Sequence, residues 1–312
     1  MNNPILVTGG SGFVGANLAR RLANDGFNVH LILRNESNTW RLNDILDKTT
    51  IHRACLINKQ EISNVIQKIR PKTIFHLAAF GAYPFQTNFE RIKAVNLDGT
   101  INLLSACEQV GFDVFINTGS SSEYGFKDKP MKETSFLEPN SDYAVFKSAA
   151  TLFCQNEARS KNLPIITLRP FSVYGPYEEK TRLVPTLIMK FLQNECPSLV
   201  APDTARDYIF VDDVVDLYLV VAKRPDLGGE IFNMGTGYQT TLKEIVNITK
   251  KMLKAKIKLK WNTMEKRSWD QNIWQADMSK TKKMLNWKPK YGLETGLEKT
   301  VAWFKNNLSL YK

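Results

Sequence analysis

The sequence predicts an α/β fold, because strand-like and helix-like apolar patterns alternate along the chain and a glycine-rich turn joins the first pair. A short buried-strand pattern at 5–8 leads into the turn, and helical apolar spacing continues from there to Gly26. A second aliphatic run at 28–33 completes one strand–helix–strand unit. The next expected elements are strands at 73–77 and 114–117 and helices at 96–110 and 142–161.

At 312 residues, the chain is long enough for one large α/β domain, or for a large domain with a smaller lobe. Its hydrophobic fraction of 43% is ordinary for a globular protein, and we find no internal repeat or low-complexity linker. The four cysteines show no CxxC or metal-ligand spacing, so we expect reduced thiols and no metal site. No basic leader precedes the first strand, and no apolar run reaches the roughly 18 residues of a membrane span. We therefore expect a soluble, cytoplasmic protein without a membrane partner.

The formal net charge of +11 admits nucleic acid, a membrane surface or a small anion as a partner. Much of the excess lies in 250–267 and 280–290. In the first of these segments, lysines alternate with Leu, Ile and Trp, which is typical of the solvated face of an amphipathic helix or strand. Because no nucleic-acid motif accompanies the lysines, we expect no nucleic-acid partner.

The glycine-rich turn reads TGGSGFVG over 8–15. Glycines let backbone amides approach a pyrophosphate, and the N-terminus of the following helix adds the positive end of its dipole. The strand and helix around the turn therefore make it a predicted dinucleotide site. The turn residues expected to contact the cofactor are Gly9, Ser11, Gly12, Phe13 and Val14.

The end of the second strand distinguishes NAD from NADP. A carboxylate there accepts a hydrogen bond from the ribose 2′-OH of NAD, whereas an arginine suits the 2′-phosphate of NADP. This chain has Arg34 at that position, Asn38 and Arg41 follow, and Glu36 comes two residues too late. Arginine with amide and hydroxyl donors binds a phosphate dianion well. The loop therefore favours NADP, with NAD as the alternative, and a polar loop without a cofactor role is the simplest other interpretation.

A tyrosine and a lysine lie four residues apart in the helix expected at 142–161. Tyr143 and Lys147 share one helix face, where the ammonium can lower the pKa of the phenol. The tyrosine can then exchange a proton with a carbinol or carbonyl oxygen. This spacing is common by chance, but here it follows the serine-tipped strand INTGSSSEYG (116–125) and a glycine turn. The three features together indicate a hydride-transfer site.

Taken together, these motifs resemble the extended short-chain dehydrogenase/reductase family, in its nucleotide-sugar epimerase, dehydratase and 4-ketoreductase group. The similarity runs through nearly the whole chain, and the motifs are specific in combination. They are TGGSGFVG (8–15), HLAA (76–79), Asn96, GSSSEYG (119–125), YAVFK (143–147), LRPFSVYGP (168–176), RDYIFVDDVVD (206–216), FNMGTG (232–237), RSWD (267–270) and DMSKTKKMLNWKP (277–289).

The resemblance implies a Rossmann-type doubly wound parallel sheet at 1–170, which binds the nicotinamide cofactor. It also implies a smaller C-terminal α/β lobe at 171–312, interleaved with the first domain near 206–235, which binds a nucleotide-diphosphate sugar. Members of the family suggest a homodimer, formed here through the helices at 96–110 and 142–161.

In this family a serine or threonine, a tyrosine and a lysine position the sugar, while a hydride moves between a sugar carbon, often C4, and the nicotinamide. Matched by position, Tyr143 is the general acid/base, and Lys147 tunes it and binds the nicotinamide ribose. Ser120 is the substrate-positioning hydroxyl, with Ser121 as the alternative. Further cofactor contacts fall at Leu77, Ala78, Ala79, Asn96 and Pro170. Further substrate contacts fall at Tyr83, Ser172, Val184, Arg206, Arg267 and Asp270.

Three departures from the family narrow the chemistry. Ser172 stands where an asparagine near the substrate phosphates is frequent, and 55–58 (CLIN) replaces an aspartate that commonly meets the adenine. In 4,6-dehydratases an Asp-Glu or Ser-Glu pair follows the catalytic threonine, whereas an ungapped match puts Ser121 and Ser122 there and Glu123 at a usually apolar position. A shift by one residue would make Ser121 the hydroxyl and Glu123 the acid. The ungapped match is simpler, and it disfavours dehydration.

We therefore expect an NADP(H)-dependent reductase of a nucleotide-linked 4-keto sugar, in deoxysugar or cell-surface glycan biosynthesis. An NAD-dependent nucleotide-sugar 4-epimerase is the close alternative, and a 4,6-dehydratase comes third. A non-catalytic Rossmann-type binding or regulatory protein is disfavoured, because Tyr143 and Lys147 are both present. The nucleotide base and the identity and stereochemistry of the sugar stay open.

Overall fold

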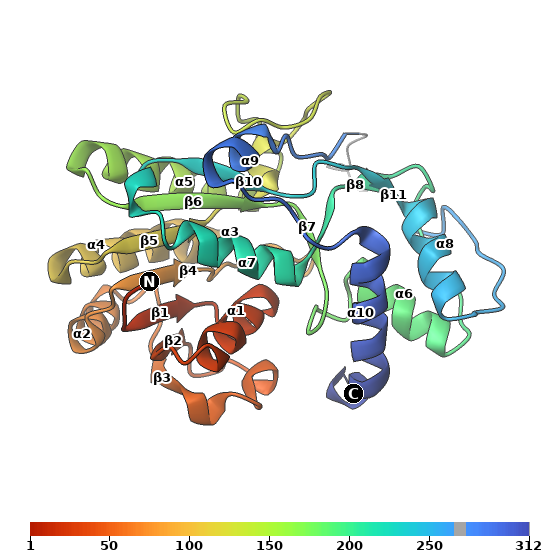
Figure 1. The fold of residues 1–312 in the computed structure, drawn as a ribbon, viewed down its shortest axis with the longest axis horizontal. Coiled ribbons are helices and arrows are strands. Elements are labelled where there is room, and N and C mark those ends of the chain that lie inside the picture. Colours follow the sequence, from red (N-terminus) through yellow and green to blue (C-terminus); the bar gives the residue numbers. More distant parts are fainter. Residues whose placement is uncertain (265–272, 312) are drawn as a thin grey trace. The chain divides into compact units, whose positions relative to one another are not determined.

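The computed structural model describes residues 1–264 and 273–311 (Figure 1). Its contacts divide the chain into two compact units. The first consists of Met1–Gly125, Phe136–Pro170 and Val215–Phe232, and the second of Phe126–Ser135, Phe171–Val214 and Asn233–Lys312. The chain therefore passes between the units repeatedly.

A seven-stranded parallel sheet forms the centre of the first unit, in the order β10-β6-β5-β4-β1-β2-β3. The strand order reverses at β1, which lies between β2 and β4, and ligands of open α/β sheets bind at such a switch point. The expected doubly wound parallel sheet is thereby confirmed. The strands are β1 (Ile5–Thr8), β2 (Val29–Leu33), β3 (Thr49–Arg53), β4 (Thr73–His76), β5 (Val114–Thr118), β6 (Ile165–Pro170) and β10 (Ile231–Met234).

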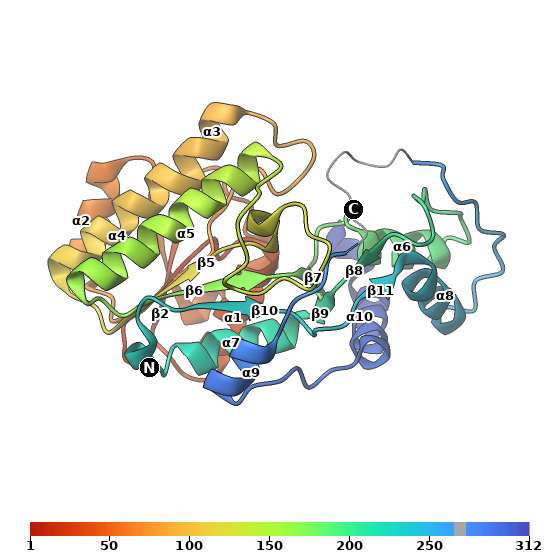
Figure 2. The same cartoon turned by 90° about the horizontal axis from the view of Figure 1, so that it is seen from above.

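Helices cover both faces of this sheet (Figure 2). Helices α2, α4 and α5 lie together on one face, and α1 and α7 lie on the other. Ile62 and Ile66 of α2, Leu103 of α4 and Phe115 of β5 belong to one buried cluster, so the apolar faces of these helices close the core. The helices are α1 (Phe13–Asn24), α2 (Lys59–Ile69), α3 (Phe89–Lys93), α4 (Gly99–Val110), α5 (Asp142–Lys161) and α7 (Val211–Val221).

The helix expected at 96–110 begins earlier than its apolar pattern indicates. Helical structure starts at Phe89, and a π-helical segment, Ala94–Asp98, joins α3 to α4. The Asn96 side chain on this segment is buried, and its Oδ1 accepts a hydrogen bond from the Phe80 N–H at 3.2 Å. The one-residue excess of a π turn interrupts the 3.6-residue period, which explains why the pattern hid the first turns.

The second unit combines two short sheets with helices. In one sheet β7 (Ser172–Tyr174) pairs in parallel with β9 (Tyr208–Phe210), and in the other β8 (Ala205–Arg206) pairs antiparallel with β11 (Thr240–Thr241). Buried Asp207 accepts backbone N–H groups of Thr236, Gly237 and Ala276, and so ties three segments together. The helices are α6 (Leu183–Leu192), α8 (Leu242–Met252), α9 (Ser279–Leu285) and α10 (Leu293–Asn307). Short 3₁₀ turns in the two units are η1 (Trp40–Leu42), η2 (Leu46–Lys48), η4 (Ser121–Tyr124), η5 (Pro225–Leu227) and η6 (Leu308–Tyr311).

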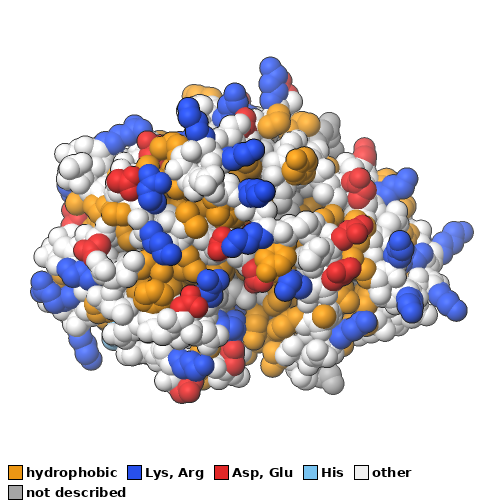
Figure 3. Space-filling model, in the orientation of Figure 1, with side chains coloured by type: hydrophobic (Ala, Val, Ile, Leu, Met, Phe, Trp, Pro, Cys, Tyr) orange, Lys and Arg blue, Asp and Glu red, His pale blue; other side chains and the backbone are white. Residues whose placement is uncertain are grey.

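The lysine-rich segment after α8 is solvated, as expected. Within 254–260 the lysines are exposed and the apolar residues between them are partly buried, although this stretch belongs to no helix or strand. On the face shown in Figure 3, Lys and Arg side chains are scattered among acidic and neutral ones. Across residues 1–264 and 273–311, we find no helix with both the length and the apolarity to cross a membrane. The cytoplasmic location stays a prediction.

Candidate active site

The glycine turn between β1 and α1 has no room for a side chain at Gly9 or at Gly15. Gly9 has a φ of +71°, and a Cβ there would lie 2.6 Å from the backbone nitrogen of Ala78. A Cβ on Gly15 would lie 2.2 Å from the carbonyl oxygen of Gly9. Gly12 caps α1 without a side-chain hydrogen bond, so no cap side chain occupies the N–H groups of the first turn. These features fit a dinucleotide pyrophosphate at the N-terminus of α1. The expected contacts Ser11, Phe13 and Val14 are partly buried at the same turn.

The expected cofactor contacts Leu77, Ala78 and Ala79 directly follow β4, the neighbour of β1. The N–H of Ala78 donates to Thr8 Oγ1 at 3.3 Å, and this oxygen lies 2.7 Å from Nδ1 of His76. Burial lowers the pKa of His76 to about 3. The imidazole is therefore neutral, and it connects the ends of β1 and β4 through hydrogen bonds rather than through charge.

Two arginines lie near one carboxylate beyond β2, and a third donates to the backbone beside them. Nη1 of Arg34 lies 3.0 Å from Oε1 of Glu36, and Nη2 of Arg91 lies 3.8 Å from the same oxygen. Arg53 ends β3 opposite Leu33, and its Nη1 donates to the Arg34 carbonyl at 2.7 Å. Sequence reasoning missed Arg53 and Arg91. A charged residue at the end of the strand that pairs with β2 is the signal that could have indicated Arg53.

The loop after Arg34 is held by local contacts. Oδ1 of Asn38 accepts a hydrogen bond from the N–H of Trp40 at 3.0 Å. The guanidinium of Arg41 lies over the Trp40 ring, 4.3 Å from its centroid. These contacts shape the loop, so Asn38 and Arg41 have a structural role in it.

Helix α5 presents the tyrosine and the lysine. Ser141 caps this helix, and Tyr143 is partly buried in its first turn. Lys147 is buried, and its ammonium donates to the carbonyl of Thr118 at the end of β5. Burial lowers the pKa of Lys147, and the negative charge of Glu123 opposes this shift. The helix thus places an exchangeable phenol one turn from a buried ammonium.

The serine cluster forms a turn at the end of β5. Ser120 is the N-cap of η4, and its Oγ accepts a hydrogen bond from the N–H of Ser122 at 3.1 Å. Ser120 and Ser121 are 7% and 5% exposed. Both serines are therefore buried in the first unit, and little of either is in contact with solvent.

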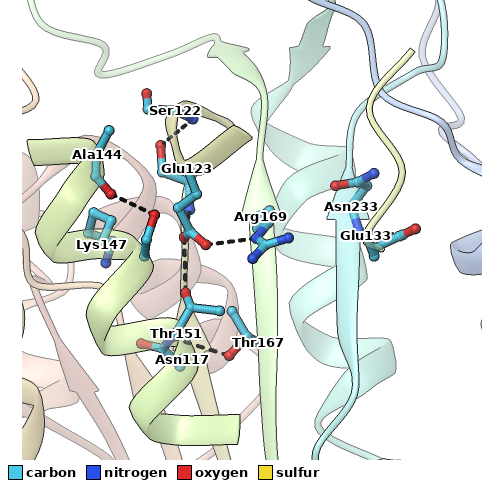
Figure 4. Close-up of polar contacts among 12 residues, drawn as sticks. Asn117, Ser122, Glu123, Glu133, Ala144, Lys147, Thr151, Thr167, Arg169 and Asn233 are labelled. Atoms are coloured by element: carbon cyan, nitrogen blue, oxygen red, sulfur yellow. Dashed lines mark hydrogen bonds and ion pairs between the residues drawn. The ribbon is translucent and has the colours of Figure 1, made fainter. Parts of the chain in front are cut away.

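Glu123 is fully buried beneath this turn (Figure 4). Its Oε2 lies 2.8 Å from Nε of Arg169 on β6. Its Oε1 accepts the N–H of Ser120 at 2.7 Å and the hydroxyl of Thr151 at 3.0 Å. Both carboxylate oxygens are therefore bound inside the first unit.

The first unit also contains three other expected contacts. Asn96 uses its amide to hold the Phe80 backbone, and Pro170 is partly buried at the end of β6. Tyr83 stacks on Phe85, with ring centroids 5.5 Å apart. No observation assigns these residues to a ligand, and their roles stay predictions.

The expected substrate residues of the second unit differ in their surroundings. The Arg206 guanidinium lies 5.0 Å from the centroid of the Trp274 ring. Ser172 begins β7 and is partly buried, whereas Val184 of α6 is 1% exposed, which leaves its side chain little surface for a ligand. Arg267 and Asp270 lie outside the described residues.

Known proteins are similar to this chain in sequence and in fold over nearly its whole length. The model of the NAD dependent epimerase/dehydratase family matches residues 5–235. A UDP-glucuronate 4-epimerase from Thermodesulfobacterium geofontis is 30% identical over 321 residues, which cover 98% of this chain and 98% of the relative.

Two solved structures extend the comparison. One is a UDP-glucose 4-epimerase from Thermotoga maritima with UDP-glucose, which has a TM-score of 0.88 and 26% identity over 97% of this chain and 99% of the other. The second is a dTDP-glucose 4,6-dehydratase from Bacillus anthracis in complex with NAD, with a TM-score of 0.86 and 25% identity over 98% and 97%. With the glycine turn and the Tyr143/Lys147 pair, these matches show that the chain is an enzyme of the NAD-dependent epimerase/dehydratase family, within the extended short-chain dehydrogenase/reductases.

Proposed function

We propose that the protein is an NADP(H)-dependent reductase of a nucleotide-linked 4-keto (deoxy)sugar, in deoxysugar or cell-surface glycan biosynthesis. The observation that carries this proposal is Arg34 in place of a carboxylate after β2. Arg34 and Arg91 already contact one carboxylate, that of Glu36, and Arg53 lies beside Arg34. Three guanidinium groups favour a 2′-phosphate dianion over a 2′-hydroxyl. Since reductases consume the reduced, phosphate-bearing cofactor, this preference favours reduction.

The residues of the first unit supply the proton chemistry of such a reduction. The nicotinamide, when bound, provides the hydride for C4 of the keto sugar. Tyr143 donates its phenol proton to the C4 oxygen, and the Lys147 ammonium stabilises the resulting tyrosinate. Ser120, with Ser121 as the alternative, donates a hydrogen bond to the same oxygen. In the lobe at 171–312, we assign the nucleotide diphosphate to Arg206.

Dehydration would require a carboxylate at the serine turn that can remove a proton from the sugar. Serines occupy positions 121 and 122, and the next residue, Glu123, is buried in its ion pair with Arg169. This burial supports the ungapped match of the serine cluster. It also supports a site limited to hydride and proton transfer at C4.

An NAD-dependent 4-epimerase is the second candidate, and the epimerase relatives favour it. An epimerase returns the hydride to the opposite face of the same carbon, so it consumes no cofactor. Tyr143, Lys147 and Ser120 would serve both reactions. Arg34 is the residue that separates the two candidates.

Two measurements on the purified protein test the proposal. Mass spectrometry of the released cofactor identifies NADP or NAD, and a panel of CDP-, GDP-, UDP- and dTDP-linked 4-keto sugars is scored for NADPH consumption. We expect NADP as the released cofactor and stoichiometric oxidation of NADPH. A Tyr143→Phe control should still bind the cofactor but lose the oxidation of NADPH. Retained NAD with interconversion of C4 epimers and no net cofactor change would establish the epimerase instead.

We also propose a homodimer through α4 and α5. Val145 and Leu152, two helical turns apart on α5, are 44% and 53% exposed, and Phe89 of α3 is 47% exposed. Exposed apolar side chains along one face indicate an interface. Light scattering should give twice the chain mass for the wild type and one chain mass for Leu152→Glu, whereas a monomeric wild type contradicts the proposal.

A further inference from the structure

We propose that Glu123 is a positioning residue, which holds the serine turn at a set distance from the face of α5 that carries Tyr143 and Lys147. The inference rests on the proposed roles of Ser120 and Tyr143, but it does not depend on the choice between reductase and epimerase. In this proposal Glu123 is not the acid that a dehydratase would use. Its carboxylate fixes the geometry of the site and does not act on the substrate.

The carboxylate joins three elements of the first unit. It accepts the N–H of Ser120, which fixes the turn after β5, and it pairs with Arg169 on the adjacent strand β6. It also accepts the hydroxyl of Thr151 on α5. Figure 4 shows Glu123 between the helix and the strand, with its contacts directed to both.

Thr151 continues the catalytic face of α5. Tyr143, Lys147 and Thr151 follow one another at intervals of four residues, so they lie along one side of the helix. The helix is thus attached twice to the β5 end: Lys147 donates to the Thr118 carbonyl, and Thr151 donates to Glu123. Two attachments one turn apart restrain sliding and rotation of the helix, and hence the place of the Tyr143 phenol.

Gly119 leaves space for the Glu123 carboxylate, because it has no side chain. A Cβ on Gly119 would lie 2.6 Å from Oε1 of Glu123 and 3.1 Å from Cγ of Arg169. The Arg169 guanidinium also lies 4.7 Å from the centroid of the Tyr124 ring. A buried ion pair commonly stabilises a fold no more than a well-packed apolar pair would. Orientation of the turn is therefore a better physical reason for two buried charges than stability.

Two variants separate positioning from folding. Thr151→Val removes one attachment and leaves the ion pair intact, and Thr73→Val is its control, since Thr73 is equally buried but donates to Asn2 O at the start of β4. The double variant Glu123→Val with Arg169→Leu removes both charges together, so that no buried charge is left without its partner.

The readouts are kcat and KM for the sugar nucleotide that the wild type converts, the Kd for NADPH by fluorescence, and the melting temperature. We expect Thr151→Val to lose about tenfold in kcat, and the double variant more, with KM and Kd within about twofold, because a misplaced proton donor slows the chemical step. Thr73→Val should keep the wild-type kcat at a comparable melting temperature. Wild-type kcat in a folded Thr151→Val or double variant overturns the proposal, as does an equal loss in Thr73→Val.

Hydrogen exchange decides the inference even if no sugar nucleotide is converted. The peptide that covers 119–125 should exchange faster in Thr151→Val than in the wild type or in Thr73→Val. Unchanged exchange there overturns the positioning role, whereas faster exchange without turnover in the wild type refutes only the proposed reaction.

Discussion

Replacement of Glu178 by glutamine should make the protein more resistant to alkaline pH. Glu178 lies between β7 and α6 in the second unit and is 5% exposed, and its Oε2 has no hydrogen-bond partner among residues 1–264 and 273–311. Burial raises the pKa of this carboxyl from 4.5 to about 8, and Arg182, whose Nε is 3.9 Å away and 42% exposed, offsets only part of the shift. Above pH 8 the folded protein therefore contains a buried carboxylate with little compensation.

The size of the effect follows from the two pKa values. Between 4.5 and about 8, the folded state binds the Glu178 proton and the unfolded state does not, so the free energy of unfolding falls as the pH rises. Each pH unit contributes about 1.4 kcal/mol, which gives roughly 3–4 kcal/mol between pH 5 and pH 8. For a chain of this length, that amounts to about 5 °C in melting temperature. Glutamine resembles the protonated carboxyl and removes this dependence.

Thermal unfolding of the wild type and Glu178→Gln at pH 5 and pH 8 provides the assay. The two proteins should melt at similar temperatures at pH 5, and the variant should melt about 5 °C higher at pH 8. Glu298→Gln, the same change at an exposed position of α10, is the control and should show no such divergence. Parallel melting curves for wild type and Glu178→Gln across this range would refute the reasoning.

Three further predictions concern the first unit. Tyr143→Phe should lower kcat by about 10²–10⁴-fold with NADPH binding unchanged by fluorescence titration, because only the proton donor is lost; a retained kcat would exclude Tyr143 as the acid. Arg34→Ala should raise the Kd for NADPH by about tenfold and leave that for NADH within twofold, because one charge-assisted contact is lost; equal changes for both cofactors would contradict a phosphate contact. Gly15→Ala should abolish binding of either cofactor or prevent folding, because the added Cβ would lie 2.2 Å from the Gly9 carbonyl. Calorimetry measures the cofactor affinity, and a folded variant with the wild-type affinity would contradict this prediction.

Local signals explain which parts of the fold were predictable. The helix at 142–161 agrees with α5 to the residue, because the Ser141 cap and the left-handed Asn162 end it sharply. The π-helical segment before α4 has no comparable signal, so the start at Phe89 was missed.

The candidate site also contains features that local sequence motifs predict and features that they do not. The glycine turn and the Tyr143/Lys147 pair are contiguous motifs with known spacing. The contact between Glu123 and Arg169 joins residues 46 positions apart, one in the turn after β5 and the other on the neighbouring strand β6. No signal in the serine motif indicates Arg169 as the partner of Glu123. The burial of the carboxylate therefore depends on tertiary structure alone.

The repeated passage of the chain between the two units determines how the protein can be dissected. A fragment that ended at Pro170 would lack Val215–Phe232 of the first unit, and it would contain neither α7 nor β10. Strand β6 would then become an open sheet edge with unpaired N–H and C=O groups, which is a template for aggregation. The first unit is therefore not a separable module, and truncations designed from the motif order alone should yield insoluble protein.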